Sequence, residues 1–413
     1  MANVGQGDKR QSHGPGAYAL AFLSLGFRPF FLGAALFGVL AIGMWVLSLR
    51  AVTLISPGYG MTMWHMHEML FGYGPAVLSG FLLTAVPNWT GRKPLTGMGL
   101  GALWLLWLVG RVVMMTAVPQ AVMIVLDVAF LPVVAVVMGA GIVAAQNWRN
   151  LVVLGPIALF GVANAIFHYE ASQLGYADYG IRLGLAALVF LITLIGGRII
   201  PAFSRNWLVK QGSNRRPVGF GRFDGIVLLM SAVALALWVL LPVGGATALA
   251  LALIAVLHGV RMTRWAGLAT RPEPLLFVLH AAYAMIPTGL VLLSLGAGTG
   301  NGGLQVGALH VLGIGAIGGM TLSVMIRASL GHTGRALRAD GWLRAGLMFV
   351  FASAGARVAA EFLAGNPVWI DLSAGLWMAG FSVFVLRIGP SLVTPRPGGL
   401  RNEWMARMNG WAE

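Results

Sequence analysis

The segment WHMHEML at residues 64–70 gathers metal-binding side chains in one short stretch. It contains His65, His67 and Glu68, and four methionines interleave with them: Met61, Met63, Met66 and Met69. Imidazole is a ligand for copper and haem iron, and thioethers favour Cu(I), so the segment suits copper or haem. Two alternatives stay open at this point, since methionines also fill gaps between helices and paired histidines also form hydrogen-bonded clusters.

The spacing of these residues limits what one site can use. Residues two apart on a regular helix diverge by about 200°, so we expect His65 and His67 to face nearly opposite directions. They then serve two neighbouring sites, or one binds metal while the other supports it. Glu68 is three residues after His65, and on a regular helix it lies on the same face, where it could orient His65 or relay protons.

Further histidines are expected at a similar depth. His168 lies near the end of an apolar stretch that runs outward, with Asn164 one turn before it on the same face. His310 lies a few residues into another stretch. Three helices thus bring four histidines into one layer, the periplasmic third of the membrane, and this arrangement favours a metal over a purely structural role.

A second, weaker group is expected towards the other side of the membrane. His258 lies at the end of one apolar stretch and His280 at the start of the next, so the two could pair. His332 follows a third stretch. Asp127, by contrast, lies in an apolar stretch about eight residues from its periplasmic end, where it could pair with Arg111 or lead protons inward; a buried salt bridge is the simpler alternative.

The elements that must position these residues are transmembrane helices. Of the 413 residues, 58% are hydrophobic and only 9% are charged, which is too few charges for the surface of a soluble protein of this size. We predict an all-α polytopic membrane protein with about twelve transmembrane helices. The predicted spans are 28–49, 63–86, 97–116, 119–145, 151–170, 181–200, 224–242, 245–263, 274–295, 304–327, 342–362 and 367–389.

The basic residues predict the orientation. All Lys and Arg fall on the side of the N-terminus except Arg50, Arg111, Arg182 and Arg357, so the positive-inside rule places both termini in the cytoplasm. This rule also explains the net charge of +15, and we expect no nucleic-acid partner. The predicted organisation is a single membrane domain, 1–413, whose cytoplasmic parts are a polar tail at 1–23, a basic loop at 201–222 between two six-helix halves, and a tail at 390–413.

Several motifs resemble the NnrS family of haem- and copper-containing bacterial membrane proteins, which are associated with denitrification and nitric oxide stress. The matching strings are GFRPFF (26–31), WHMHEMLFGYGPAVLSGFLLTAVPNWTGRKP (64–94), GGRIIPAFSRN (196–206), PLLFVLHAAYAMIPTGL (274–290) and ALHVLGIGAIGGMTLSVMIRASLGHTGR (308–335). The resemblance implies a twelve-helix protein of the bacterial inner membrane that holds haem and copper and handles nitric oxide. The chain has no cysteine, so the haem is expected to be a non-covalent b-type haem.

The resemblance also implies which residues bind metal. The family's histidines match His65, His67, His168, His280, His310 and His332, whereas His258 lies outside any matching motif. Arginines at cytoplasmic helix ends anchor the helices or bind haem propionates, and the candidates for the latter are Arg28, Arg198 and Arg327.

The leading functional hypothesis is an enzyme that binds and reduces nitric oxide at a haem–copper centre on the periplasmic side, with Glu68 and Asp127 as proton carriers and an electron donor that the sequence does not identify. The alternative is a non-catalytic haem or copper protein that senses or buffers nitric oxide or handles metal. A transporter is disfavoured because the two halves show no convincing repeat.

Overall fold

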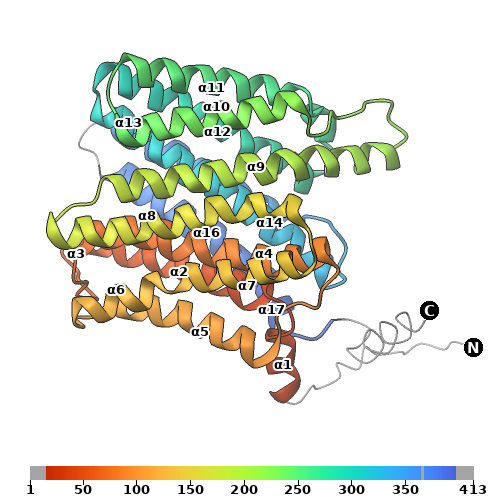
Figure 1. The fold of residues 1–413 in the computed structure, drawn as a ribbon, viewed down its shortest axis with the longest axis horizontal. Helices are drawn as coiled ribbons and strands as arrows, with labels where there is room; N and C mark the ends of the chain where they lie inside the picture. Colours follow the sequence, from red (N-terminus) through yellow and green to blue (C-terminus); the bar gives the residue numbers. More distant parts are fainter. Residues whose placement is uncertain (1–14, 364–366, 397–413) are drawn as a thin grey trace, which may run out of the picture.

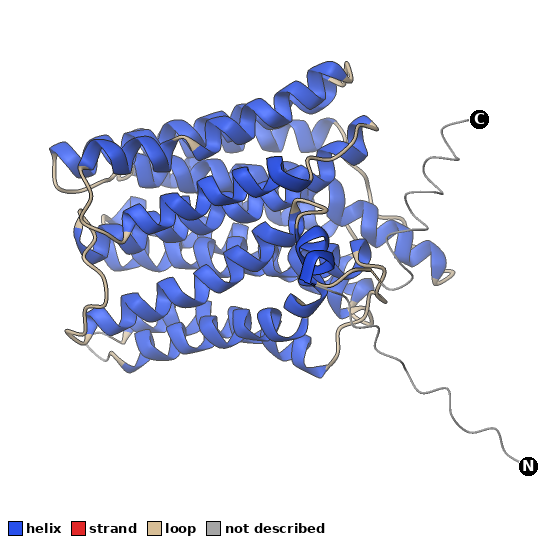
Figure 2. Ribbon diagram, turned by 90° about the horizontal axis from the view of Figure 1, so that it is seen from below, coloured by secondary structure: helices blue, strands red, loops and turns tan. Residues whose placement is uncertain are grey.

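The computed structural model describes residues 15–363 and 367–396, and within them every regular element is a helix (Figure 2). Twelve helical spans in this part of the chain are long and apolar enough to cross a membrane, which confirms the predicted fold class. Eight of them are α2 (Phe27–Leu49), α5 (Gly97–Met114), α9 (Tyr179–Lys210), α10 (Arg222–Leu240), α11 (Gly245–Thr263), α12 (Pro274–Thr299), α15 (Gly341–Phe362) and α16 (Val368–Arg387).

The other four spans are composite. They are α3 (Gly60–His67) with η1 (Glu68–Tyr73) and α4 (Gly74–Thr90); α6 (Gln120–Val128) with α7 (Phe130–Ala144); η2 (Trp148–Val153) with α8 (Leu154–Gln173); and α13 (Gly302–His310) with η4 (Val311–Gly318) and α14 (Gly319–His332). Two short helices, α1 (Pro15–Phe22) and α17 (Gly389–Val393), flank the spans.

The spans lie side by side, with α10, α11 and α12 at one edge of the bundle and α5 and α6 at the other (Figure 1). Helix α9 joins the two halves, since it packs against α8 and also against α10 and α12. Helices α1 and α17 contact each other, so the described chain begins and ends on the same side of the bundle. We call this side the terminal side and the opposite side the distal side.

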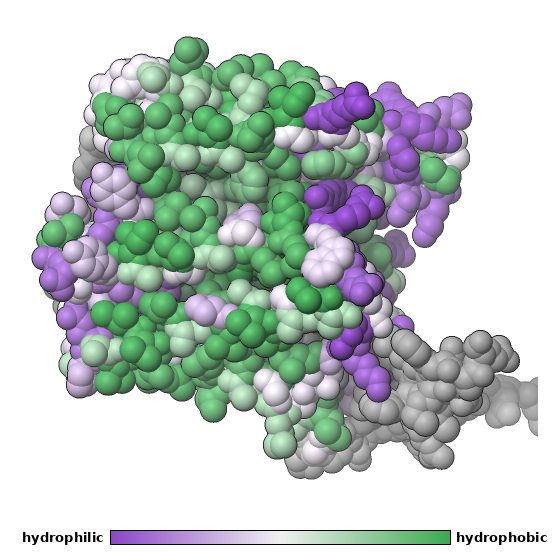
Figure 3. All heavy atoms as spheres, viewed as in Figure 1, coloured by the Kyte–Doolittle hydropathy of each residue, from purple (hydrophilic) through white to green (hydrophobic). Residues whose placement is uncertain are grey.

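Large apolar side chains cover much of the face of the bundle that Figure 3 shows, between these two sides. Leu229 and Leu386, for example, are 68% and 73% exposed. A water-soluble protein rarely exposes a continuous apolar surface of this extent, whereas a bilayer solvates it.

Two spans contain a π-helical segment, and each segment begins directly after a histidine. η1 follows His67 and η4 follows His310. For η1 the cause lies in Pro75, which has no N–H to donate to the carbonyl of Phe71, so the helix widens there rather than forming a regular α-turn. π-Helical turns inside α-helices often lie at functional sites.

Some predicted boundaries were wrong. The loop expected at 201–222 is shorter, because α9 continues through Pro201 to Lys210. His332 lies on α14 rather than after it. The predicted tails also contain α1 and α17, and the rest of each tail lies largely outside the described residues.

Candidate metal centre

His67, at the end of α3, is the centre of a buried polar cluster on the distal side of the bundle. Its Nδ1 atom lies 3.0 Å from Oε1 of Glu68. Its Nε2 atom lies 3.1 Å from Oδ2 of Asp127 and 3.0 Å from Oδ1 of Asn164. The side chains of His67 and Glu68 are both completely buried, so these contacts replace the hydrogen bonds that water would supply.

Asp127 connects three further helices to this cluster. Its Oδ2 atom lies 3.0 Å from Nε2 of His168 and accepts a hydrogen bond of 2.7 Å from Nδ2 of Asn164; both residues lie on α8. Its Oδ1 atom pairs with Arg111, on α5. Asp127 itself is on α6, so one carboxylate joins α3, α5, α6 and α8.

Arg111 supplies the positive charge that lets two carboxylates be buried here. Besides Asp127 it pairs with Glu68, whose Oε2 atom lies 2.5 Å from Nη1. Its side chain is only 4% exposed. An unpaired carboxylate would cost several kcal/mol at this depth, so the arginine is required by the two acids.

The hydrogen bonds around His67 fix its charge. Glu68, Asp127 and Asn164 all present acceptor oxygens to its two ring nitrogens, and the amide of Asn164 cannot be reversed because its nitrogen donates to Asp127. Both ring nitrogens of His67 thus face oxygen atoms, an arrangement that stabilises a positively charged ring. With Arg111, a protonated His67 balances the two carboxylates, and a monovalent cation such as Cu(I) bound in place of the ring proton would keep this balance.

Aromatic rings enclose the cluster. Phe71 and Phe167 lie 5.4 Å and 4.9 Å from the ring of His67, measured between ring centroids. On the distal side, the hydroxyl group of Tyr59 lies 3.1 Å from Nδ1 of His168. Tyr59 is half-buried, and burial raises the pKa of its hydroxyl group, which therefore stays neutral at physiological pH.

The donor atoms converge as metal ligands do. One atom each of His67, Asp127 and His168 lie within 4.8 Å of one another, and all three residues are buried. Two imidazoles and a carboxylate are a recurrent ligand set for iron, copper and zinc, and leave positions open for other ligands.

The profile of the family described as NnrS protein matches residues 21–396, which include every residue of this cluster. The chain belongs to the NnrS family. It is therefore a multi-pass NnrS-family membrane protein linked to the response to nitric oxide, and the resemblance found in the sequence is confirmed. Among curated proteins, no sequence matches this chain.

Two of the four histidines expected in one layer of this NnrS-family protein belong to the cluster, and two do not. His65 stacks face to face on Trp45, with 4.7 Å between ring centroids, and it interacts electrostatically with His310 and Arg357 rather than with Asp127. His65 and His67 thus have different surroundings, as the helical spacing predicted. Trp45 and Tyr59 were missed, because lone aromatic residues near helix ends are common and carry no specific signal.

The predicted position of Glu68 was wrong. It was expected on the face of His65, but its carboxylate lies between His67 and Arg111. The physical reason is the charge of Arg111 on the neighbouring helix, which the spacing within one helix does not reveal. Asp127 and Arg111 do form the ion pair that was one of the two expected arrangements.

The histidines nearer the terminal side lie in separate surroundings. The two ring nitrogens of His258 lie 2.9 Å from the hydroxyl oxygens of Ser231 and Tyr283. Both nitrogens are therefore hydrogen-bonded within the protein, which is typical of a structural histidine. His280 lies 2.8 Å from Oγ of Ser204, and His332 packs on Phe27. No pairing between His258 and His280 is present among the described contacts, and metal binding by His280 and His332 stays a prediction.

The three arginines expected at haem propionates contact protein groups. Arg28 donates to the carbonyl oxygens of Leu392 and Thr394, at 3.1 and 2.8 Å. Arg198 lies over the ring of Phe220, and Arg327 lies over Phe203. His310 and Arg327 are separated by seventeen positions of one span, about 25 Å, so a haem bound to His310 would not reach Arg327. A propionate role for these arginines stays a prediction, and it concerns a haem near the terminal side.

Proposed function

We propose that this protein binds nitric oxide and reduces it at metal sites on the distal side of the membrane, which we take to be the periplasmic side. The observation that carries the proposal is the buried convergence of His67, Asp127 and His168, compensated by Arg111. Ionisable groups inside a membrane are often functional, and two imidazoles and a carboxylate that converge at this depth form a ligand set for a cation.

The cluster fits a copper ion. Each of the three residues offers one ligand atom, and Asn164 and Glu68 hold the imidazole of His67 in place. The ion would supply a Lewis acid and a one-electron redox centre beside the aromatic wall.

His65 and His310 are the residues that would hold a haem on the distal side. The ring of His310 donates through Nδ1 to the carbonyl oxygen of Val306 at 2.8 Å, which leaves the lone pair of Nε2 for a metal. Nδ1 of His65 is buried without a hydrogen-bond partner. A haem held by one of these two imidazoles would supply an iron that can bind a diatomic molecule.

The cluster also contains a continuous hydrogen-bonded chain for protons. Without an ion it runs from Tyr59 through His168, Asp127 and His67 to Glu68, with heavy-atom distances between 3.0 and 3.1 Å. An ion at the Nε2 atoms of the two histidines would leave the contacts of Tyr59 and Glu68 with the Nδ1 atoms in place. Reduction of two nitric oxide molecules to nitrous oxide and water consumes two protons and two electrons. Tyr59 and Glu68, at the two ends of the chain, would deliver the protons, and an external donor would supply the electrons.

A second candidate function is metal handling or buffering of nitric oxide without turnover. It is favoured by the methionines of α3 and η1, since Met61, Met63, Met66 and Met69 are all half-buried beside the histidines. Thioethers at such positions suit the transfer of Cu(I) to a buried site.

The deciding experiment is metal analysis and optical spectroscopy of the detergent-purified protein, followed by nitric oxide consumption with an artificial electron donor. The proposal expects copper, a haem that extracts into acidified organic solvent, and formation of nitrous oxide. Bound metal without nitrous oxide would favour the second candidate. Protein that lacks both metals after expression with copper and haem supplied would overturn both.

A further inference from the structure

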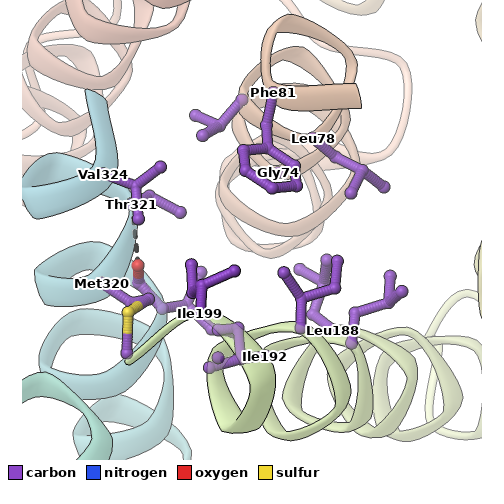
Figure 4. Close-up of a pocket in the computed structure, with 14 residues that line it drawn as sticks. Gly74, Leu78, Phe81, Leu188, Ile192, Ile199, Met320, Thr321 and Val324 are labelled. Carbon is purple, nitrogen blue, oxygen red and sulfur yellow. Dashed lines mark hydrogen bonds between the residues drawn. The ribbon is translucent and has the colours of Figure 1, made fainter. Parts of the chain in front are cut away.

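An apolar cavity of about 90 Å³ lies between α4, α9 and the span formed by η4 and α14 (Figure 4). Of its fourteen lining residues none is charged, and Thr321 carries the only polar side chain. The hydroxyl group of Thr321 is already engaged, since it donates to the carbonyl oxygen of Ile317 at 2.7 Å and lies 2.6 Å from the hydroxyl oxygen of Tyr73. The cavity therefore offers no free polar group to a ligand.

One end of the cavity approaches the candidate metal centre. Gly74 and Leu188 line this end, and a Cβ atom added to Gly74 would lie 3.1 Å from Leu188 and 3.4 Å from Phe160. The ring of Phe160 lies 5.3 Å from that of Phe71, which in turn lies 5.4 Å from the ring of His67. Two phenylalanine rings in contact thus separate the cavity from the metal-binding histidine.

The other end reaches the outer surface of the bundle. Phe81, Ile199 and Val324 line this end and are half-exposed, in the region where the surface faces lipid. Leu188 and Ile199 lie eleven residues apart on α9, so the cavity extends roughly 16 Å along the helix.

Size and chemistry limit the ligand. Water in a cavity needs two to four polar partners, and a comparable apolar cavity of about 150 Å³ stays dry and binds xenon or benzene. A space of about 90 Å³ is too small for a porphyrin, whereas it holds a neutral diatomic molecule. Its opening faces the hydrocarbon layer, in which an apolar gas dissolves.

We propose that this cavity admits nitric oxide from the bilayer and passes it between Phe160 and Phe71 to the site at His67. The inference rests on the proposed function, because it names the route by which the substrate of that site arrives. Thermal rotation of the two rings would open the route.

The first test uses xenon as an apolar probe of similar size, which needs no bound metal. Crystals of the metal-free protein under xenon pressure should show xenon beside Ile192 and Leu188. The double variant Ile192→Phe with Val324→Phe fills the cavity and should lose this xenon. The matched control, Ile226→Phe with Val233→Phe, makes the same changes at exposed positions of α10 and should keep it.

The second test measures nitric oxide association with the metal-loaded protein by stopped flow. The filled variant should associate at least about tenfold more slowly than the control variant, while the metal content of both stays unchanged. Each single variant, Ile192→Phe or Val324→Phe, should give a smaller decrease, which keeps the test usable if the double variant does not fold.

The outcomes separate the route from the proposed function. Absence of xenon, a lipid chain seated in the cavity, or equal association rates in the filled and control variants would overturn the route and leave the metal site standing. Failure of the metal-loaded protein to bind any nitric oxide would overturn the proposed function, and the route with it, even if xenon occupies the cavity.

Discussion

Nε2 of His67 lies 3.1 Å from Oδ2 of Asp127, although sixty positions separate the two residues in the chain and a complete membrane span, α5, lies between them. The same oxygen is shared with His168 and Asn164, at 3.0 and 2.7 Å. Three donors around one carboxylate oxygen make this atom the point at which the α3, α6 and α8 helices are fixed to one another. Asp127 therefore serves both the stability of the bundle and the proposed metal site.

Replacing Arg111 by glutamine should destabilise the protein strongly. The change leaves two buried carboxylates without their shared counter-charge, so we expect the free energy of unfolding to fall by about 3–5 kcal/mol. The control is Arg50→Gln, because Arg50 pairs with Asp371 at the surface and such pairs contribute about 0–1 kcal/mol. Thermal and denaturant unfolding in detergent measure both, and equal losses in the two variants would contradict the assignment of the buried pair.

Alanine variants of the distal histidines should fall into two groups. His67→Ala and His168→Ala remove ligands of the same proposed site, so both should lose copper and keep the haem spectrum. His65→Ala and His310→Ala should change the haem spectrum and keep copper. Metal analysis and optical spectra measure both properties, and the two groups act as each other's controls. If His65→Ala and His67→Ala lost the same single metal, the division into two sites would be wrong.

Hydropathy was sufficient to predict the fold. Each stretch of about twenty apolar residues became a span, because a helix of this length is the only way for such a stretch to satisfy its backbone in lipid. The predicted ends of two helices were wrong, because α9 and α14 continue past the apolar stretch to Lys210 and His332. These ends project past the hydrophobic region, and hydropathy carries no information on helix that continues outside it.

The depth of the candidate site's residues could be predicted from the sequence, and their pairings could not. His67, Asp127 and His168 were all expected near one side of the membrane, since the topology fixes depth. Which of them meet depends on the rotation of each helix and on ion pairs between helices, and Glu68 was misplaced for this reason. The π-helical segment η1 adds to the difficulty, because a wide turn shifts the faces of all residues that follow it.

Tyr59→Phe should slow proton-coupled turnover and leave the metals in place. The substitution removes only the hydroxyl group that reaches Nδ1 of His168, at the distal end of the proposed proton chain. We expect nitric oxide reduction to slow by about tenfold or more, since a positioned proton donor contributes about 10²–10⁴-fold and water replaces part of its function. Tyr169→Phe is the matched control, because Tyr169 is the next residue after His168 and is 66% exposed. Nitric oxide consumption with excess electron donor measures both, and an unchanged rate in Tyr59→Phe would remove Tyr59 from the chain.

The distal side should face the periplasm. The terminal side carries the loop between α9 and α10, at 211–221, with Lys210, Arg215 and Arg216 in or beside it, and such clusters of basic residues are retained in the cytoplasm. The chain has no cysteine, so a single introduced cysteine reports its own side of the membrane. A membrane-impermeant maleimide should label Tyr176→Cys, in the loop between α8 and α9, in cells whose inner membrane is intact. It should label Asn214→Cys only after that membrane is permeabilised. The reverse pattern would place His67, Asp127 and His168 on the cytoplasmic side, and the proton chain through Tyr59 would then draw its protons from the cytoplasm.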